Sequence, residues 1–379
     1  MSTQENKAIF RRYVEEVFNG ENVQLADEIF DRYLAHQPNG STLERGPEDV
    51  KRFVGEFHEA FPNFQSTLED QIGEGDKVVT RWRLRGTHQG EFRGMAPTGM
   101  EMEINGIGIF RFSPDGKVVE SWDSYDQLNL MRQSIEQELR MARDIQQASL
   151  PKQVPELEGW QVNPFYQPAQ EVGGDFYDFF ELEEGRVGLV VGDATGKGVP
   201  AALVVSATCS MLRAVAQALG SSSPGEVLER VNETLFARIP PNMFVTCFYA
   251  ILDPKSGSLR YANAGHDLPY LRPRGGDCEE LRARGMPLGL MPGMSYEEKE
   301  IVLDAGDSAL FYSDGLVEAH DPQREMFGFP KLRALVAEHG GKQSLGEFLL
   351  EELYSFVGEG WEQEDDITLL TLRRFPTLS

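Results

Sequence analysis

Hydrophobic residues in the first third of the chain follow first a helical and then a strand-like pattern. Ile9, Tyr13 and Val17 recur at four-residue spacing and predict an amphipathic helix. A second helix is expected from Gly46-Pro47 onward, because proline suits the first turn of a helix. Long β-prone runs then predict antiparallel strands, over residues 76–89, 100–113 and 117–125.

Residues 127–150 contain neither glycine nor proline and predict a single helix that ends before Pro151. Apolar residues keep a spacing of three or four along it: Leu128, Met131, Ile135, Leu139, Ala142 and Ile145. A seam of this kind is enough to join two copies of the chain when folded domains flank it, so a homodimer is expected. Packing of the helix on the C-terminal part of its own chain would explain the same pattern.

The C-terminal part of the chain alternates apolar runs with two helical stretches. The runs predict strands over residues 175–180, 186–191, 243–252, 258–263 and 308–312. Helices are expected at about 199–219 and 224–238. The first approaches the length of a membrane span, but five polar residues interrupt it: Ser206, Thr208, Ser210, Arg213 and Gln217. We therefore expect a buried helix and no contact with a membrane.

Composition and charge narrow the class of protein. A chain of 379 residues is long enough for two or three domains, and its 36 basic and 61 acidic side chains leave a formal charge of −25. Such a surface would repel nucleic acid and anionic lipid, so neither is expected as a partner. The three cysteines, Cys209, Cys247 and Cys278, are far apart and indicate neither a disulfide framework nor a zinc site. The first residues lack a secretory pattern, and a cytoplasmic location is expected.

Four acidic corners carry the chemistry of the C-terminal part. Asp175, Asp193, Asp314 and the pair Asp365-Asp366 each adjoin an apolar run or a small residue, where a strand would end. Converging carboxylates repel one another unless divalent cations neutralise them, and carboxylate oxygens are ligands that hard cations prefer. The pattern therefore predicts a site for divalent metal ions.

Six motifs around these corners occur in a characteristic order. They are Gly-Gly-Asp175, Gly192-Asp193-x-x-Gly-x-Gly198, Asn263-Ala-Gly-His266, Pro287-Leu-Gly289, Ser313-Asp314-Gly315 and Asp365-Asp366-x-Thr368. This order resembles that of the bacterial SpoIIE-type serine phosphatases, a branch of the protein phosphatase 2C superfamily. The resemblance implies an α-β-β-α sandwich that holds two Mn²⁺ or Mg²⁺ ions, in which a bridging water attacks phosphoserine or phosphothreonine.

The resemblance also implies roles for individual residues. Asp193 would bridge the two metals, with the Ala194 carbonyl as a neighbouring ligand. The remaining ligands would be Asp314, Asp365 and Asp366, while Asp175 would orient ligands or metal-bound water. No arginine matches the phosphate-binding arginine of the eukaryotic enzymes, so the metals would hold the phosphate. Three further residues are placed in the vicinity of the phosphate: Gly174, Asn263 and His266. For His266, a structural role in a hairpin is favoured over proton transfer.

The N-terminal part carries a second resemblance. Its closing run Gly116-Lys-Val-Val-Glu-Ser-Trp122-Asp123 and the upstream Gly106-Ile-Gly-Ile-Phe-Arg-Phe112 are similar to strands of the SnoaL-like polyketide cyclases. That family has a nuclear-transport-factor-like cone fold, in which helices are wrapped by a curved sheet around a pocket. Residues of the type that would line such a pocket are Tyr13, His36, Phe61, Trp82, His88 and Trp122, although an ordinary position in the core or at the rim is favoured for each of them.

These inferences predict an α+β chain of three parts. They are a cone-fold sensor domain over residues 1–131, a linker helix over 132–158 and a phosphatase domain over 159–379. The expected substrate is a phosphorylated protein, namely an anti-sigma-factor antagonist of a partner-switching pathway. The N-terminal domain is expected to be a sensor or a dimerisation module, and a small hydrophobic ligand is a candidate for its pocket. Two alternatives remain open: a non-enzymatic scaffold of such a pathway, and an additional cyclase or isomerase activity in the N-terminal domain.

Overall fold

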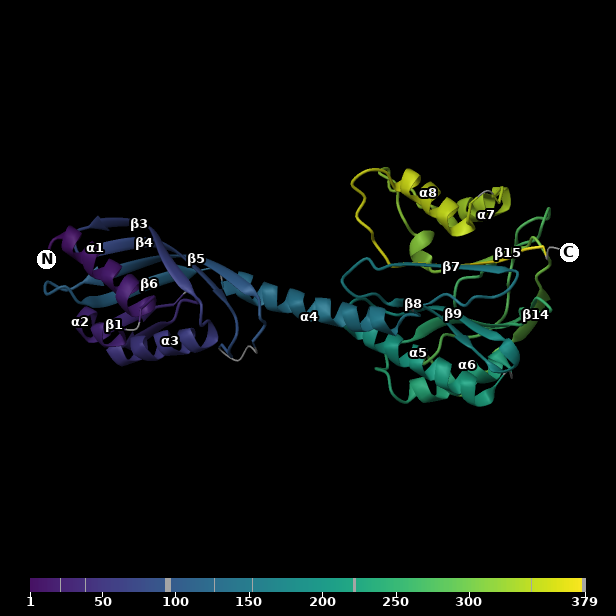
Figure 1. Cartoon of the computed structure of the whole chain (residues 1–379), viewed down its shortest axis with the longest axis horizontal. Coiled ribbons are helices and arrows are strands. Elements are labelled where there is room, and N and C mark those ends of the chain that lie inside the picture. The colour runs from purple at the N-terminus through teal and green to yellow at the C-terminus, as the bar shows by residue number, and fades with distance from the viewer. Residues whose placement is uncertain are drawn as a thin grey trace. The chain divides into compact units, whose positions relative to one another are not determined.

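A computed structural model gives the structure of the chain. It describes residues 1–376 except Glu21, Pro38, 93–96, Asp126, Lys152, 221–222 and Lys342, and it does not describe the side chains of residues 127–134 and 137. The chain divides into two compact units, Met1–Glu138 and Leu139–Ser379. Helix α4, Gln127–Ser149, contains the boundary between them (Figure 1).

The N-terminal unit is a six-stranded sheet covered by helices. Its helices are α1 Thr3–Arg12, α2 Ala26–Ile29 and α3 Pro47–Ala60, with a π-helical turn at Tyr13–Phe18 and a 3-10 turn at Val23–Leu25. Its strands are β1 Phe30–His36, β2 Thr42–Arg45, β3 Gln65–Glu74, β4 Lys77–Thr87, β5 Glu101–Phe112 and β6 Val118–Tyr125, in the order β2-β1-β6-β5-β4-β3. The two helices and three strands expected from the sequence pattern are all present.

Local sequence explains where these elements begin. Ser2 caps α1 by accepting the backbone N–H of Glu5, while the Glu5 carboxylate accepts the N–H of Ser2. Pro47 starts α3, where Asp49 accepts the N–H of Gly46 at 2.9 Å. Along β5, every second residue from Met102 to Phe112 is buried, so one face of this strand packs on the core.

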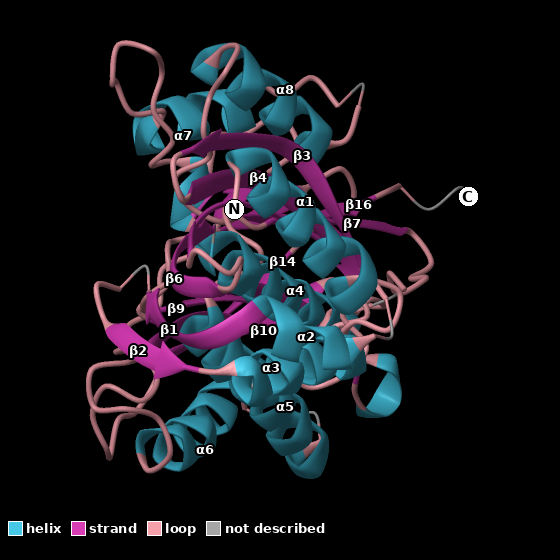
Figure 2. Ribbon diagram, turned by 90° about the vertical axis from the view of Figure 1, so that its left-hand side faces the viewer, coloured by secondary structure: helices cyan, strands magenta, loops and turns pink. Residues whose placement is uncertain are grey.

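The C-terminal unit consists of two five-stranded sheets between two pairs of helices. One sheet has the order β14-β11-β10-β9-β8 and the other β13-β12-β15-β16-β7. The strands are β7 Trp160–Gln167, β8 Asp175–Glu181, β9 Val187–Ala194, β10 Val245–Leu252, β11 Ser258–Ala264, β12 Tyr270–Arg272, β13 Glu279–Glu280, β14 Glu298–Val302, β15 Ser308–Tyr312 and β16 Ile367–Arg374. The helices are α5 Val199–Leu219, α6 Pro224–Phe236, α7 Gly328–Glu338 and α8 Leu345–Val357, and Figure 2 shows the two pairs on opposite sides of the strands.

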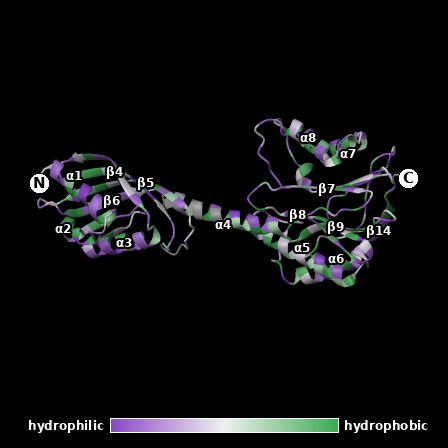
Figure 3. Ribbon diagram, viewed as in Figure 1, coloured by the Kyte–Doolittle hydropathy of each residue, from purple (hydrophilic) through white to green (hydrophobic). Residues whose placement is uncertain are grey.

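Three hydrophobic layers hold this sandwich together. One lies between α5, α6 and the first sheet, with Phe176 and Leu212 at its centre. A second fills the space between the sheets around Phe248 and Phe311, and the third joins the second sheet to α7 and α8 around Tyr312. The apolar character of the strands between the helices is visible in Figure 3. This is the α-β-β-α arrangement predicted from the sequence.

Helix α5 is long and apolar enough to cross a membrane by length and composition alone. In the structure, however, seven of its residues are buried: Ala201, Ala202, Val204, Val205, Thr208, Leu212 and Ala216. Five of them, all except Ala202 and Thr208, belong to the first layer. The Thr208 hydroxyl bonds to the Val204 carbonyl within the helix. α5 is therefore a core helix of the sandwich, as the polar interruptions in its sequence predicted.

Candidate active site

Three of the predicted aspartates meet where strands of the two sheets end. Asp175 begins β8 and Asp193 lies near the end of β9, and the two are direct partners in the antiparallel register. Asp314 comes two residues after β15, a strand of the other sheet. One carboxylate oxygen from each of these residues lies within 4.8 Å of the other two. The sandwich thus brings together three residues from distant parts of the sequence.

The cluster is electrostatically unfavourable without a cation. Burial raises the pKa of Asp193 to about 8, and the charges of Asp314 and Asp365 add to the effect. Burial, followed by Glu318 and Asp365, raises the pKa of Asp314 to about 6. Burial and then Asp193 raise the pKa of Asp175 well above its ordinary value. A divalent cation would stabilise the ionised form of all three carboxylates, whose oxygens are the donors that Mn²⁺ and Mg²⁺ bind, so the residues fit the predicted metals.

Asp366 binds the backbone of the loop before β8, and its predicted role as a metal ligand stays a prediction. Its Oδ2 accepts the backbone N–H of Gly174 at 2.6 Å and that of Asp175 at 3.2 Å, and its Oδ1 accepts that of Ala169 at 2.7 Å. With both oxygens bonded to this loop, Asp366 holds the loop that carries Asp175. Thr368 holds Asp175 directly, because its hydroxyl donates to Oδ2 at 2.7 Å.

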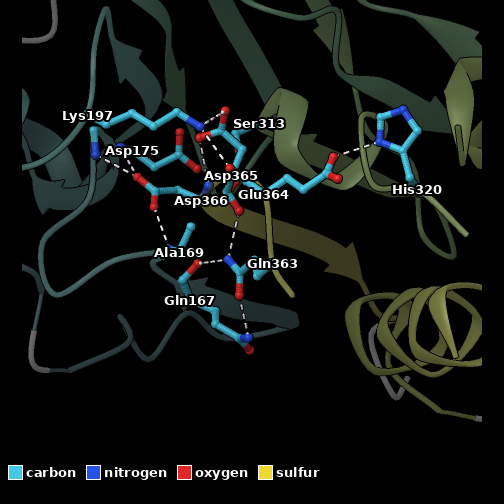
Figure 4. Close-up of polar contacts among 11 residues, drawn as sticks. Gln167, Ala169, Asp175, Lys197, Ser313, His320, Gln363, Glu364, Asp365 and Asp366 are labelled. Carbon is cyan, nitrogen blue, oxygen red and sulfur yellow. Dashed lines mark hydrogen bonds and ion pairs between the residues drawn. The ribbon is translucent and has the colours of Figure 1, made fainter. Parts of the chain in front are cut away.

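Asp365 lies at the edge of the cluster and pairs with a lysine. The Lys197 ammonium is 3.0 Å from Asp365 Oδ2 and donates to the Glu364 carbonyl at 2.8 Å (Figure 4). The Glu364 carboxylate in turn binds His320 and Arg324. Lys197 was not among the predicted site residues, although its position in Gly196-Lys197-Gly198, directly after the Asp193 corner, is a signal in the sequence.

Asn263 and His266 form a closed turn and do not join the cluster. Asn263 accepts the N–H of His266 and donates to its carbonyl. The His266 ring bonds through Nε2 to the Tyr312 carbonyl at 3.0 Å and through Nδ1 to the Thr246 hydroxyl at 2.9 Å. Burial lowers the pKa of His266 to about 4, so the ring is neutral at pH 7. These contacts agree with the structural role favoured for His266. The placement of Asn263 and His266 in the vicinity of the phosphate stays a prediction.

Gly174 and Ala194 tie the two aspartate corners to each other. The Ala194 N–H donates to the Gly174 carbonyl at 2.9 Å, next to the register pair of Asp175 and Asp193. A Cβ on Gly174 would lie 3.0 Å from the Ala194 carbonyl oxygen and 3.1 Å from Asp193 Oδ1. A side chain at position 174 would crowd the cluster, which explains the glycine.

The end of helix α4 supports the same loop, which the sequence pattern did not predict. Gln146 is buried, donates through Nε2 to the Gly173 carbonyl at 2.7 Å and accepts the Gly173 N–H at 3.0 Å. Arg143, one turn earlier, pairs with Glu171 at 2.9 Å. The last turns of α4 therefore pack on the C-terminal unit, whereas Ile135, Met141 and Ile145 are exposed.

The N-terminal unit encloses a cavity of about 390 Å³ that is lined mainly by aromatic and aliphatic side chains. Tyr13 and Trp82 line it, as the sequence predicted, together with Phe53, Phe57 and Asp123. Burial raises the pKa of Asp123 to about 6, and nearby Arg45 lowers it less. The described part of the unit thus holds a mostly apolar cavity with two carboxyl groups on its wall, those of Asp123 and Asp49.

The other predicted lining residues lie elsewhere. His36 is the register partner of Trp122, and their stacked rings have centroids 4.9 Å apart. Nε2 of His36 lies 2.9 Å from a carboxylate oxygen of Glu120. His88 stacks on Phe61 at 5.0 Å. The cavity lining therefore lacks four of the residues predicted for it: His36, Phe61, His88 and Trp122. A histidine that would form an acid–base pair with Asp123 is thus absent from the described lining of the cavity.

Each of the two units is similar to a known protein family. The family described as Stage II sporulation protein E (SpoIIE) matches residues 183–375, and the SnoaL-like polyketide cyclase family matches residues 8–134. Phosphoserine phosphatase RsbU of Bacillus subtilis is 29% identical over 262 residues, which cover 67% of this chain and 75% of RsbU. Aklanonic acid methyl ester cyclase AcmA of Streptomyces galilaeus is 35% identical over 134 residues, or 34% of this chain and 90% of AcmA.

Among solved structures, the SiaA-PP2C domain of Pseudomonas aeruginosa superposes with a TM-score of 0.57 at 24% identity, covering 65% of this chain and 99% of that domain. This likeness supports the fold. The chain spans less than half the length of other curated relatives that it matches.

The sandwich and its carboxylate corner define the class of the C-terminal unit, which is a serine phosphatase domain of the PP2C type. The chain belongs to the SpoIIE family, and its N-terminal unit is a SnoaL-like domain. Both resemblances and the α+β fold class predicted from the sequence are confirmed.

Proposed function

We propose that this protein removes the phosphoryl group from phosphoserine or phosphothreonine in a protein substrate with the help of two divalent metal ions. The observation that carries the proposal is the meeting of Asp175, Asp193 and Asp314, with Asp365 beside them. The similarity to RsbU, a phosphoserine phosphatase, supports it. An intact set of carboxylates also favours an enzyme over a non-enzymatic scaffold of the same fold.

Within the site, Asp193, Asp314 and Asp365 would hold Mn²⁺ or Mg²⁺, with the Ala194 carbonyl beside Asp193. When bound, such ions supply an activated water and neutralise the negative charge that develops on the phosphoryl oxygens. Asp175 is 2% exposed and is fixed by Thr368 and by the loop that Asp366 holds. Its role is to orient the ligands, because a carboxylate held by its own hydrogen bonds keeps one position during the reaction.

The substrate that we propose is the phosphorylated form of an anti-sigma-factor antagonist in a partner-switching pathway of the cytoplasm. This proposal extends the SpoIIE-type resemblance and the similarity to RsbU. We propose further that the protein is a homodimer joined along α4, where Ile135, Met141 and Ile145 expose apolar surface.

For the N-terminal unit we propose a regulatory role through a small ligand in its cavity. The wall is mainly aromatic and also carries the carboxyl groups of Asp123 and Asp49, so the ligand would be a mostly apolar ring compound with a hydrogen-bond donor that reaches them. Asp123 also favours a second candidate function, acid–base isomerisation of such a compound, which the similarity to the cyclase AcmA supports. Quenching of Trp82 fluorescence by a panel of phenolic compounds tests binding, and product analysis separates the two roles.

Hydrolysis of a phosphoserine peptide by the full chain, with Mn²⁺, with Mg²⁺ and with excess chelator, tests the phosphatase proposal. We expect turnover only when a divalent ion is present. Undiminished turnover in chelator would contradict the metal mechanism, and no turnover with any of the ions, on any phosphopeptide or aryl phosphate, would favour the scaffold.

A further inference from the structure

Lys197 occupies a position that the chemistry proposed above leaves unexplained. Its ammonium group reaches from the turn after Asp193 to the corner that carries Asp365, where it is bound by the Asp365 carboxylate and the Glu364 carbonyl. Asp365 is close enough to the cluster for its charge to raise the pKa of both Asp193 and Asp314. One cation of the chain itself thus neutralises the outermost carboxylate of the centre.

A carboxylate that pairs with an ammonium group is less available to a metal ion. Asp365 carries one negative charge, and a divalent ion that takes its Oδ2 must displace Lys197 or share the oxygen with it. Two cations on one carboxylate also repel each other. Metal at Asp365 and the ammonium group of Lys197 therefore compete for the same carboxylate oxygen.

We propose that Lys197 is an internal counter-ion of the metal centre, which neutralises Asp365 while the ion at this corner is absent and is exchanged for that ion when it binds. The inference rests on the proposed function for the assignment of Asp365 as a ligand. Lys197 then sets the metal concentration at which the second ion binds. It acts through Asp365 and is a positioning residue, not a catalytic one.

The surface of the same unit offers a matched control. Lys299 and Glu297 form an ion pair at 2.8 Å with side-chain exposures of 48% and 37%, against 51% and 35% for Lys197 and Asp365 at 3.0 Å. The two pairs are alike in distance and exposure. Only the pair of Lys197 and Asp365 adjoins the carboxylate cluster, so a difference between the two lysine variants reports on the metal centre.

Calorimetric titration of the metal-free full chain with Mn²⁺ tests the proposal. Lys197→Met should tighten the weaker of the two binding events about three- to fivefold, the range expected for loss of a half-exposed ion pair. Lys299→Met should change it less than about twofold, and Lys197→Arg, which keeps the charge, should stay near wild type. In an Asp365→Asn background, Lys197→Met should have no further effect.

Weaker or unchanged Mn²⁺ binding by Lys197→Met would overturn the proposal. Weaker binding would mean that the lysine presents Asp365 to the metal, and unchanged binding that the pair is incidental. A lowered melting temperature of Lys197→Met without metal, restored by saturating Mn²⁺, provides a second measurement that supports the exchange. Because both readouts measure binding, they stay informative if the phosphopeptide assay fails, and that assay alone decides the proposed function.

Discussion

Asp175 and Asp193 face each other directly across the antiparallel strands β8 and β9. Like charges in this arrangement normally destabilise a sheet, and here both side chains are largely removed from water. Their pairing lowers the stability of the metal-free protein, as is common at functional sites, and a bound cation would relieve the repulsion. The pairing of Asp175 with Asp193 would therefore destabilise the metal-free protein and favour binding of a cation.

Replacing Asp193 by asparagine should separate its contribution to catalysis from its effect on the stability of the metal-free protein. At saturating Mn²⁺, Asp193→Asn is expected to lower turnover of a phosphoserine peptide by at least ~10²-fold, because the variant loses a ligand charge and metal affinity together. Without metal, its melting temperature should equal or exceed that of wild type, since the repulsion with Asp175 is removed. Asp277→Asn, at an exposed turn of the same unit, is the control. A variant that keeps most of the wild-type rate would show that the centre lies elsewhere.

The partly buried Asp123 should make the stability of the N-terminal unit depend on pH. Its pKa in the folded chain, about 6, lies above its ordinary value of 3.8, so folding favours the protonated form. The sign follows: the stabilisation is complete below about pH 4 and is lost as the pH rises through 6, by at most about 3 kcal/mol. Asp123→Asn should remove this loss and be the more stable protein at pH 7.5.

Calorimetric melting of the full chain at pH 5 and pH 7.5 checks the expectation through the transition of the N-terminal unit. Asp31→Asn, an exposed position on β1 of the same sheet, should keep the wild-type pH dependence. Equal pH dependence in wild type and Asp123→Asn would mean that the carboxyl group is ionised at little cost in the cavity.

The sequence predicted elements better than the faces on which their side chains lie. Apolar runs next to glycine or aspartate predicted β8, β9, β10, β11 and β15. These strands lie between a helix layer and the other sheet, and burial on both faces makes such strands almost continuously hydrophobic. In β6, however, Ser121 and Asp123 line the cavity while Trp122 between them does not. Successive residues of a strand point to opposite faces, and composition alone did not tell which face of this strand is the inner one.

The same ambiguity affected the acidic pair at the second corner. Asp365 and Asp366 are neighbours in sequence, yet Asp365 binds Lys197 and Asp366 binds the backbone of residues 169–175. Their difference depends on a loop almost 200 positions earlier in the chain. Contacts of that range, like those of Gln146 with Gly173, leave no periodic signal in the sequence.

The apolar seam of α4 should matter for assembly if it joins two copies of the chain. Ile135 is 56% exposed, and Leu139 follows one turn later. Replacing both by glutamate would place like charges against each other across a dimer seam, so Ile135→Glu/Leu139→Glu should weaken dimerisation and change specific activity together. Light scattering and the phosphopeptide assay measure the two effects. An unchanged oligomeric state with an unchanged rate would mean that α4 functions within its own chain.

Gln146 should link the last turns of α4 to the metal centre. Its side chain satisfies both backbone groups of Gly173, and the adjoining Gly174 donates to Asp366. Gln146→Ala would leave two buried backbone groups unpaired, at ~1–3 kcal/mol each, and would loosen the loop that carries Asp175. We expect a higher Mn²⁺ requirement and a lower kcat for this variant, with the peptide KM changed less. Gln147→Ala, at the exposed neighbouring position, should behave as wild type. If Gln146→Ala lowers only the melting temperature and leaves the Mn²⁺ requirement and kcat unchanged, the contact stabilises the fold without positioning the site.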